Sequence, residues 1–174
     1  LAVLSRVEGL RRLRLSSLEA FFVTDRLLAA AADCGPFCAH FHLPLQSGAA
    51  PVLKAMGRPY TPGDFRDLVL NIRRGFPDAA IGLDVLVGFP GETAADFELT
   101  LDLVRRAQYH SMYSFKYSPR PGTLAGKRLA DDVPVAFKRE GPRHQPRRQR
   151  KNLPNGSNRN SDHPEYRKED DQSN

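Results

Sequence analysis

Runs of β-forming residues alternate with stretches of helical periodicity along the first 137 residues, and this alternation constrains the fold more than any other feature. The short β-forming runs, read as strands, lie at about 12–16, 40–45, 80–88 and 112–117. Strands that alternate with helices pair in parallel, because a crossover helix brings the chain back to the start of the next strand. The sequence therefore predicts an α/β fold made of four consecutive β/α units.

Helix start signals stand between these predicted strands. Thr61 and Thr93 are each followed three residues later by an aspartate, a spacing typical of a capping box, and apolar residues then recur at helical spacing. Thr24 opens a third, alanine-rich helix, and a short fourth helix is expected to end at Gly57. These helices are predicted to cover the sheet.

The composition of the chain changes near residue 138. Residues 138–174 consist mostly of Pro, Asn, Ser, Arg and acids, so they offer little apolar surface to offset the entropy of ordering them. We predict a folded domain over 1–137 and a disordered tail over 138–174. The net charge of +6 and a basic cluster at 143–151 favour an acidic partner such as RNA, although ordinary solvation also explains the cluster.

Two cysteines, Cys34 and Cys38, are present, and no apolar run has the length that a bilayer crossing requires. A cytoplasmic location is the prediction. His40 and His42 follow the cysteines, so a zinc site can be drawn, but alternation places both histidines on one face of a strand. We predict small, partly buried cysteines and no metal site.

Ligands of such folds bind at the carboxyl ends of the strands. The loops expected there are rich in small, polar and turn-forming residues, which fits either a cofactor rim or simple tight turns. The carboxylates of Glu19, Asp84 and Glu92 could converge at this end, and Asp84 could instead hydrogen-bond within the wall of the sheet. No Ser/His/Asp set has a distinctive arrangement in the sequence.

Three segments carry a family resemblance: HFHLPLQSGAAPVLKAMGRPYT, IGLDVLVGFPGET and YSFKYSPRPGT, in this order. They resemble the radical S-adenosylmethionine methylthiotransferases over residues 10–137. The resemblance implies a partial TIM-like barrel, with about four parallel strands and outer helices. It also implies binding of S-adenosylmethionine and addition of a methylthio group to a hypermodified adenosine beside the tRNA anticodon, one branch acting instead on a ribosomal protein.

The family holds a [4Fe–4S] cluster with a C-x-x-x-C-x-x-C motif that this chain lacks. By resemblance, a cluster-binding N-terminal domain and a C-terminal RNA-binding domain lie outside the chain, so the fragment is predicted to be inactive alone. A non-catalytic RNA-binding remnant is the alternative. HFHLPLQSG favours the threonylcarbamoyl-adenosine branch and SFKYSPRPGT the isopentenyl-adenosine branch; we expect the former.

The resemblance also assigns site residues at the strand ends. The residues expected to bind S-adenosylmethionine are Gln46, Ser47, Gly88, Phe89, Tyr117, Ser118 and Pro119. The residues expected to contact the tRNA substrate are Glu19, Arg58, Lys116 and Arg120. A guanidinium can hold a phosphate with two hydrogen bonds, but a solvated surface position fits both arginines equally well, and Glu19 could pair with an arginine.

Overall fold

A computed structural model of the chain describes residues 1–140 and contains one parallel sheet. Its strands are β1 (His40–Gln46), β2 (Ala80–Val87) and β3 (Ser111–Lys116), arranged in the order β1-β2-β3. Both neighbouring pairs are parallel, with Leu43 opposite Leu83 and Leu83 opposite Met112. The predicted α/β class is confirmed, and so are three of the four predicted strands.

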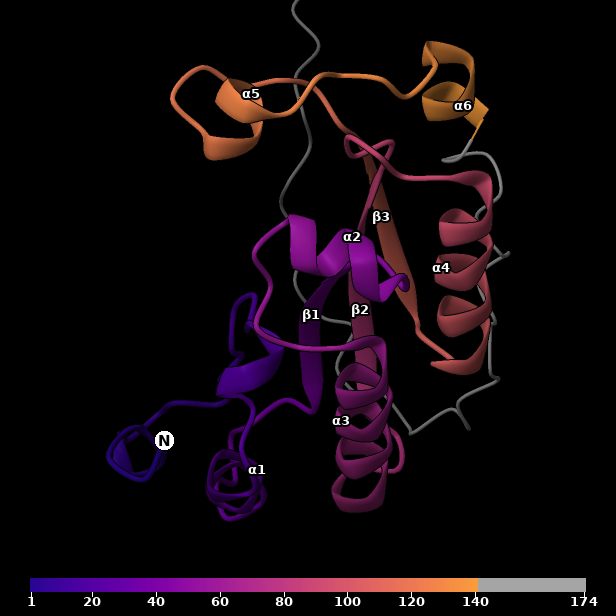
Figure 1. The fold of residues 1–174 in the computed structure, drawn as a ribbon. Coiled ribbons are helices and arrows are strands. Elements are labelled where there is room, and N and C mark those ends of the chain that lie inside the picture. Colours follow the sequence, from indigo (N-terminus) through magenta and orange to yellow (C-terminus); the bar gives the residue numbers. More distant parts are fainter. Residues whose placement is uncertain (141–174) are drawn as a thin grey trace, which may run out of the picture.

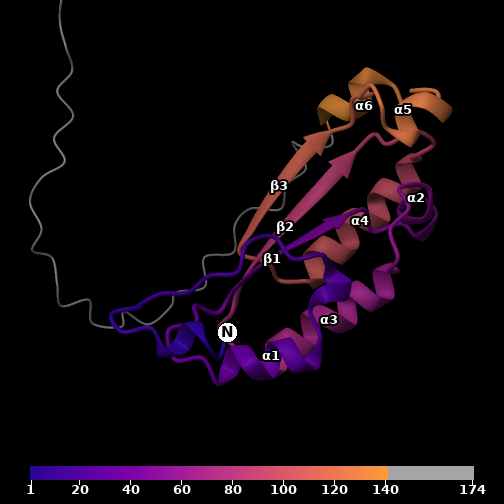
Figure 2. The same ribbon diagram turned by 90° about the vertical axis from the view of Figure 1, so that its left-hand side faces the viewer.

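The described residues also form six α-helices and two 3-10 turns. The helices are α1 (Asp25–Ala32), α2 (Ala50–Ala55), α3 (Pro62–Gly75), α4 (Ala94–Arg106), α5 (Leu124–Arg128) and α6 (Val135–Glu140). The 3-10 turns are η1 (Leu4–Arg6) and η2 (Ala20–Phe22). Figure 2 shows α1, α3 and α4 on one side of the strands, while the strand arrows point toward α5 and α6. Figure 1 shows α5 and α6 above the ends of the strands.

Three helix starts were predicted from caps, and all three are confirmed. The Thr24 side chain accepts a hydrogen bond from the backbone N–H of Leu27 at the start of α1. Thr61 and Thr93 form complete capping boxes at α3 and α4, in which each aspartate also accepts the backbone N–H of its threonine. The predicted stop of α2 is confirmed as well, since Gly57 follows it with a φ of 71°.

The predicted strand at 12–16 is wrong as a strand, although its path along the sheet is as expected. Leu13 forms an isolated parallel bridge with Phe37, and the Leu18 backbone N–H donates to the carbonyl of His42 at 2.9 Å. The segment between these two contacts makes no continuous ladder with β1. It lies at the edge of the sheet, where a strand has a neighbour on one side at most, so its backbone is held less firmly.

The two faces of the sheet differ in their surroundings. On the helix-covered face, buried residues of the strands pack against buried residues of α3 and α4; they include Phe41, Leu43, Leu45, Ile81, Leu83, Phe65, Ile72 and Val104. The opposite face is open over β3, where Tyr113 and Phe115 are 58% and 53% exposed. The helix-covered face therefore holds the main core.

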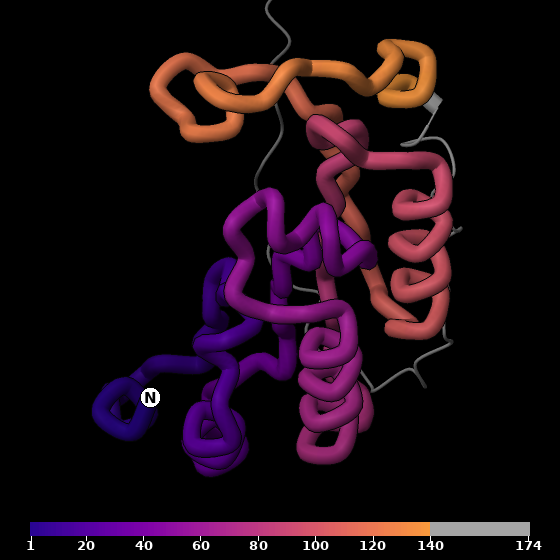
Figure 3. Tube along the Cα trace, in the orientation of Figure 1, coloured from indigo at the N-terminus to yellow at the C-terminus, as the bar shows by residue number. Residues whose placement is uncertain are grey.

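The domain boundary expected after residue 137 falls inside α6, which runs to Glu140. The remainder of the predicted tail, including the basic cluster at 143–151, lies outside the described residues. Figure 3 shows the chain after β3 crossing above the strand ends before it enters α6. None of the helices described is long and apolar enough to pass through a membrane.

Candidate cofactor pocket

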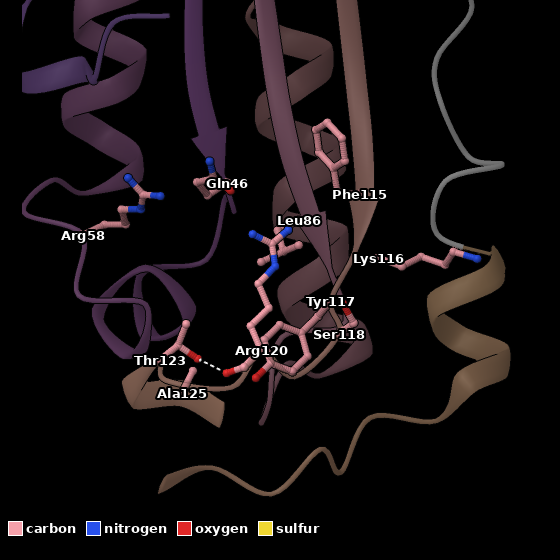
Figure 4. Close-up of a pocket in the computed structure, with 10 residues that line it drawn as sticks. All are labelled: Gln46, Arg58, Leu86, Phe115, Lys116, Tyr117, Ser118, Arg120, Thr123 and Ala125. Carbon is pink, nitrogen blue, oxygen red and sulfur yellow. Dashed lines mark hydrogen bonds between the residues drawn. The ribbon is translucent and has the colours of Figure 1, made fainter. Parts of the chain in front are cut away.

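A pocket of about 690 Å³ lies where the carboxyl ends of the three strands meet α5. This volume is within the range typical of small-molecule sites. Figure 4 shows the ten residues that line it: Gln46, Arg58, Leu86, Phe115, Lys116, Tyr117, Ser118, Arg120, Thr123 and Ala125. Six of the eleven residues predicted for the site, Gln46, Arg58, Lys116, Tyr117, Ser118 and Arg120, are thus brought to one pocket by the parallel register.

Gln46 ends β1 with a backbone conformation that is unusual for its residue type. Its φ is 66°, and the register of β1 against β2 shifts between Pro44 and Gln46. A residue other than glycine in this left-handed region is strained by about 1–3 kcal/mol, and such strain clusters at ligand sites. The kink at the end of β1 therefore sets the Gln46 amide at the pocket (Figure 4).

Arg58, which follows α2, forms a two-pronged ion pair with Glu19. Its Nη1 lies 2.7 Å from Oε1 and 2.8 Å from Oε2 of the carboxylate. Glu19 is the residue just before η2, so the contact ties that segment to the pocket. The alternative in which Glu19 pairs with an arginine is therefore the one observed, and the charge of Arg58 is largely compensated.

Arg120 and Lys116 were predicted together but lie differently. In Figure 4 the Arg120 side chain extends toward Leu86 in the middle of the pocket, whereas the Lys116 side chain extends away from Gln46 and Arg58. Both residues line the pocket. Of the predicted tRNA contacts, Arg120 thus directs its guanidinium into the middle of the pocket, whereas the guanidinium of Arg58 is paired with Glu19.

Tyr117 closes the pocket at the end of β3. Its ring packs edge-on against Phe89, with centroids 5.2 Å apart, and its backbone N–H donates to the carbonyl of Val87. Its hydroxyl is buried and has no hydrogen-bond partner among the described residues. A buried hydroxyl without a partner is costly, so this atom is suited to a polar group of a ligand.

The remaining predicted cofactor residues do not line this pocket. Ser47 is fully buried, and its hydroxyl lies 3.3 Å from the hydroxyl of Thr100 in α4 and accepts the backbone N–H of Ala49. Phe89 is buried beneath Tyr117, and Gly88, with a φ of 77°, is covered by the side chain of Lys138. These residues shape the base of the site. Pro119 is exposed beside it.

Glu92 is a buried acid of the loop after β2 whose arrangement could not be read from the sequence. Its Oε2 accepts the backbone N–H of Gly88 at 2.5 Å, while its Oε1 has no partner in the described part of the chain. Burial raises the pKa of Glu92 to about 7, with a smaller contribution from the charge of Asp96 and an opposing one from the Gly88 hydrogen bond. This carboxyl group therefore titrates near neutral pH.

Asp84 belongs to a hydrogen-bonded chain on the open face of the sheet. Its Oδ1 lies 2.9 Å from Nε2 of His42, and Nδ1 of His42 lies 3.1 Å from the hydroxyl of Ser17. These three residues have no distinctive arrangement in the sequence, since they are 25 and 42 positions apart and meet only in the fold. These hydrogen bonds tie the edge segment to β1 and β2, and Asp84 serves as a hydrogen-bonding residue of the wall. The three predicted carboxylates therefore do not converge: Asp84 pairs with His42, Glu19 with Arg58, and Glu92 with the backbone of Gly88.

Cys34 is buried at the end of α1 and Cys38 is half-buried just before β1, and both are free thiols. Within residues 1–140, no group of three or more His, Cys, Asp or Glu side chains is placed to hold a metal ion. A [4Fe–4S] cluster of the expected kind takes three or four thiolates. These residues do not fit such a cluster.

Comparison with known protein families identifies the fold. The model of the radical SAM superfamily, named for S-adenosylmethionine, matches residues 7–104, which is more than half of the chain. The chain belongs to this superfamily. Coproporphyrinogen III oxidase of Escherichia coli, itself a radical SAM enzyme, has a similar fold: the TM-score is 0.62 at 19% identity, covering 74% of this chain and 30% of that one.

Curated relatives share higher identity. The chain is 45% identical over 129 residues to tRNA-2-methylthio-N(6)-dimethylallyladenosine synthase 1 of Mycobacterium marinum, covering 74% of the chain and 24% of the relative. It is 48% identical over 122 residues to the corresponding synthase of a Parafrankia species, covering 70% and 25%. The chain thus spans about a quarter of the length of these relatives.

The pocket residues of this radical SAM chain fit S-adenosylmethionine. The pocket offers an amide at Gln46, hydroxyls at Ser118 and at the unpartnered Tyr117, and apolar surface from Leu86 and Phe115. Such a set suits a ligand that carries ribose hydroxyls and a purine ring. The cofactor therefore fits this pocket, whereas the iron–sulfur cluster has no ligand set in the part of the chain described.

Proposed function

We propose that the chain forms the cofactor-binding part of a tRNA methylthiotransferase, which adds a methylthio group to an N6-modified adenosine by radical S-adenosylmethionine chemistry. The observation that carries this proposal is the pocket at the strand ends, which collects six residues of the family motifs. The names of the related synthases support the same reaction. Two cysteines cannot supply a cluster site, so the cluster ligands would come from outside these 174 residues.

In this proposal the chain's own residues bind and orient the cofactor and the tRNA. S-adenosylmethionine, when bound beside a reduced cluster, supplies the radical. Gln46, Tyr117 and Ser118 provide amide and hydroxyl groups to the cofactor. Arg120 contacts a phosphate of the tRNA or the modified base, and Arg58, held by Glu19, shapes the adjoining wall.

We further propose N6-dimethylallyladenosine, also called isopentenyl-adenosine, as the substrate rather than the threonylcarbamoyl-adenosine that the sequence alone favours. The names of the relatives support this choice. Arg120 would then serve the phosphate backbone.

A binding experiment tests the cofactor part of the proposal. The full chain is titrated with S-adenosylhomocysteine, a stable analogue of the cofactor, by isothermal calorimetry. Tyr117→Phe is expected to weaken binding about tenfold, since removing one hydrogen bond to a buried partner costs about 1–1.5 kcal/mol. Tyr109→Phe, which lies before β3, is the matched control and leaves the affinity unchanged. Absence of binding by the wild-type chain contradicts the proposal.

A second experiment tests the substrate. Anticodon stem-loops that carry dimethylallyladenosine, threonylcarbamoyl-adenosine or plain adenosine are compared for binding to the chain at several salt concentrations. We expect the tightest binding for the first, and Arg120→Met to weaken it and flatten its salt dependence by about one phosphate contact. Arg105→Met, on the exposed side of α4, is the control. Equal affinity for all three stem-loops, unchanged in Arg120→Met, would favour the non-catalytic RNA-binding alternative.

A further inference from the structure

The segment that leads into α6, together with α6 itself, contacts the loop after β2 and helix α4. Asp132 accepts the backbone N–H of Gly91 at 2.8 Å. Phe137 packs edge-on against Phe97 of α4, with ring centroids 5.5 Å apart. Val133 is buried. In Figure 1 and Figure 3 this segment passes over the end of α4 above the strand ends. Residues 131–138, called the strap below, thus hold the loop from above.

Lys138 makes the most unusual contact of the strap, because it is a charged residue that is only 5% exposed. Its ammonium forms an ion pair with Asp131 and lies 5.3 Å from the centroid of the Tyr117 ring. Its aliphatic stem lies against Gly88, where a Cβ atom would overlap the Lys138 methylene groups. One side chain therefore contacts both Gly88 after β2 and Tyr117 after β3.

This arrangement depends on the docked position of the strap. Burial of an ammonium group is costly unless a counter-ion and close packing compensate it. Asp131 supplies the counter-ion and Tyr117 supplies a ring face that attracts a cation. Undocking of the strap would remove the packing from Gly88 and release the Tyr117 ring, which lines the pocket although Lys138 itself does not.

We propose that Lys138 is a positioning residue for the ligand of this pocket: by docking the strap, it fixes Tyr117 and the Gly88–Gly91 loop in the geometry that binds the cofactor. The inference rests on the proposed function in taking the ligand to be S-adenosylmethionine. Because linkage is reciprocal, ligand binding stabilises the docked strap by the same free energy by which docking favours binding. Binding of the cofactor and docking of the strap are then coupled.

The test uses the full chain with Lys138→Met, which keeps the aliphatic stem but removes the charge, and Asp131→Asn, which removes the counter-ion. Lys127→Met, an exposed lysine of α5, is the matched control. Val69→Ala in α3 controls for a general loss of stability, since Val69 is buried in the core. S-adenosylhomocysteine affinity is measured by calorimetry.

Amide hydrogen exchange of Gly91 reports on the strap independently of the ligand, because its acceptor is Asp132 and not a mutated residue. Lys138→Met and Asp131→Asn are expected to accelerate this exchange at least tenfold and to weaken the analogue's affinity about tenfold, while the amide of Ile72 in α3 exchanges as before. Both control variants are expected to retain the wild-type affinity.

Each other result counts against the inference in a distinct way. Unchanged Gly91 exchange in both variants would show that Lys138 does not dock the strap. Faster Gly91 exchange in Lys138→Met and Asp131→Asn, with an affinity for the analogue within twofold of wild type, would show that the strap does not position the ligand. If Val69→Ala lost as much affinity as these variants, the loss would reflect lower overall stability. A wild-type chain that does not bind the analogue contradicts the proposed function, while Gly91 exchange still decides the docking of the strap.

Discussion

Replacement of Glu92 by glutamine is expected to change how the stability of the chain depends on pH. Glutamine has nearly the same shape, and its amide oxygen can still accept the Gly88 N–H that Oε2 of Glu92 accepts. The variant cannot ionise. Any difference in pH dependence between the two proteins therefore reports the titration of this one buried carboxyl group.

The magnitude follows from the burial of the side chain, which is 6% exposed as a residue. The pKa of Glu92 is raised from 4.5 to about 7 in the folded chain, chiefly by burial. Since the folded pKa is the higher one, the folded state holds the proton more tightly, and this stabilisation is present below 4.5 and is lost as the pH rises through 7. The loss amounts to about 3 kcal/mol, because each pH unit between the two values corresponds to about 1.4 kcal/mol.

The measurement is urea unfolding followed by circular dichroism at pH 5, 6, 7, 8 and 9. The difference in free energy of unfolding, variant minus wild type, is expected to rise by about 2–3 kcal/mol across this range and to level off above pH 8. Glu98→Gln, at an exposed position of α4, serves as the control and shows a nearly constant difference. Parallel stability curves for Glu92→Gln and wild type would refute the assigned burial and pKa.

Three further substitutions test the packing and the pocket. Gly48→Ala is expected to lower the free energy of unfolding, measured with urea, by more than about 2 kcal/mol, since a Cβ would lie 2.5 Å from a backbone atom of α4. Its control is Gly75→Ala, which has open space around it and is expected to stay within about 1 kcal/mol of wild type. Gln46→Gly is expected to raise stability by about 1 kcal/mol by relieving the positive φ, yet to weaken binding of S-adenosylhomocysteine in calorimetry. Glu19→Gln is expected to cost less than about 1 kcal/mol of stability and to steepen the salt dependence of RNA binding by about one charge, because Arg58 loses its partner. An unchanged result in any of these would contradict the contact on which it rests.

Local features of the chain could be predicted from its sequence. Thr24, Thr61 and Thr93 were identified as helix caps because each bonds to a backbone group within three residues, so the whole interaction is contained in a short segment. The three paired strands were predictable because short runs of β-forming residues alternate with stretches of helical periodicity. Residues 12–16 also alternate apolar and polar side chains, but whether they pair as a strand depends on which strands lie beside them.

The placement of the strand ends in one pocket also followed from sequence order, since parallel strands bring their carboxyl ends to the same edge. What each side chain does there was decided by contacts between distant parts of the chain. Glu19 is 39 residues from Arg58, and the two meet only because η2 packs beside the turn after α2. Likewise, Lys138 lies in a stretch that reads as the start of a polar tail, and its burial against Gly88 and Tyr117 became visible only in the fold.

The sequence by itself therefore determined the fold class, the starts of α1, α3 and α4, and the edge of the sheet at which the strand ends gather, because these depend on periodicity and on hydrogen bonds within a few residues. Only the tertiary structure decided which predicted residues face the pocket, which are neutralised by a partner and which carry a shifted pKa. The physical reason is that burial and charge pairing depend on neighbours in space. Glu92 shows the difference, since the same residue in an exposed loop would be an ordinary ionised acid.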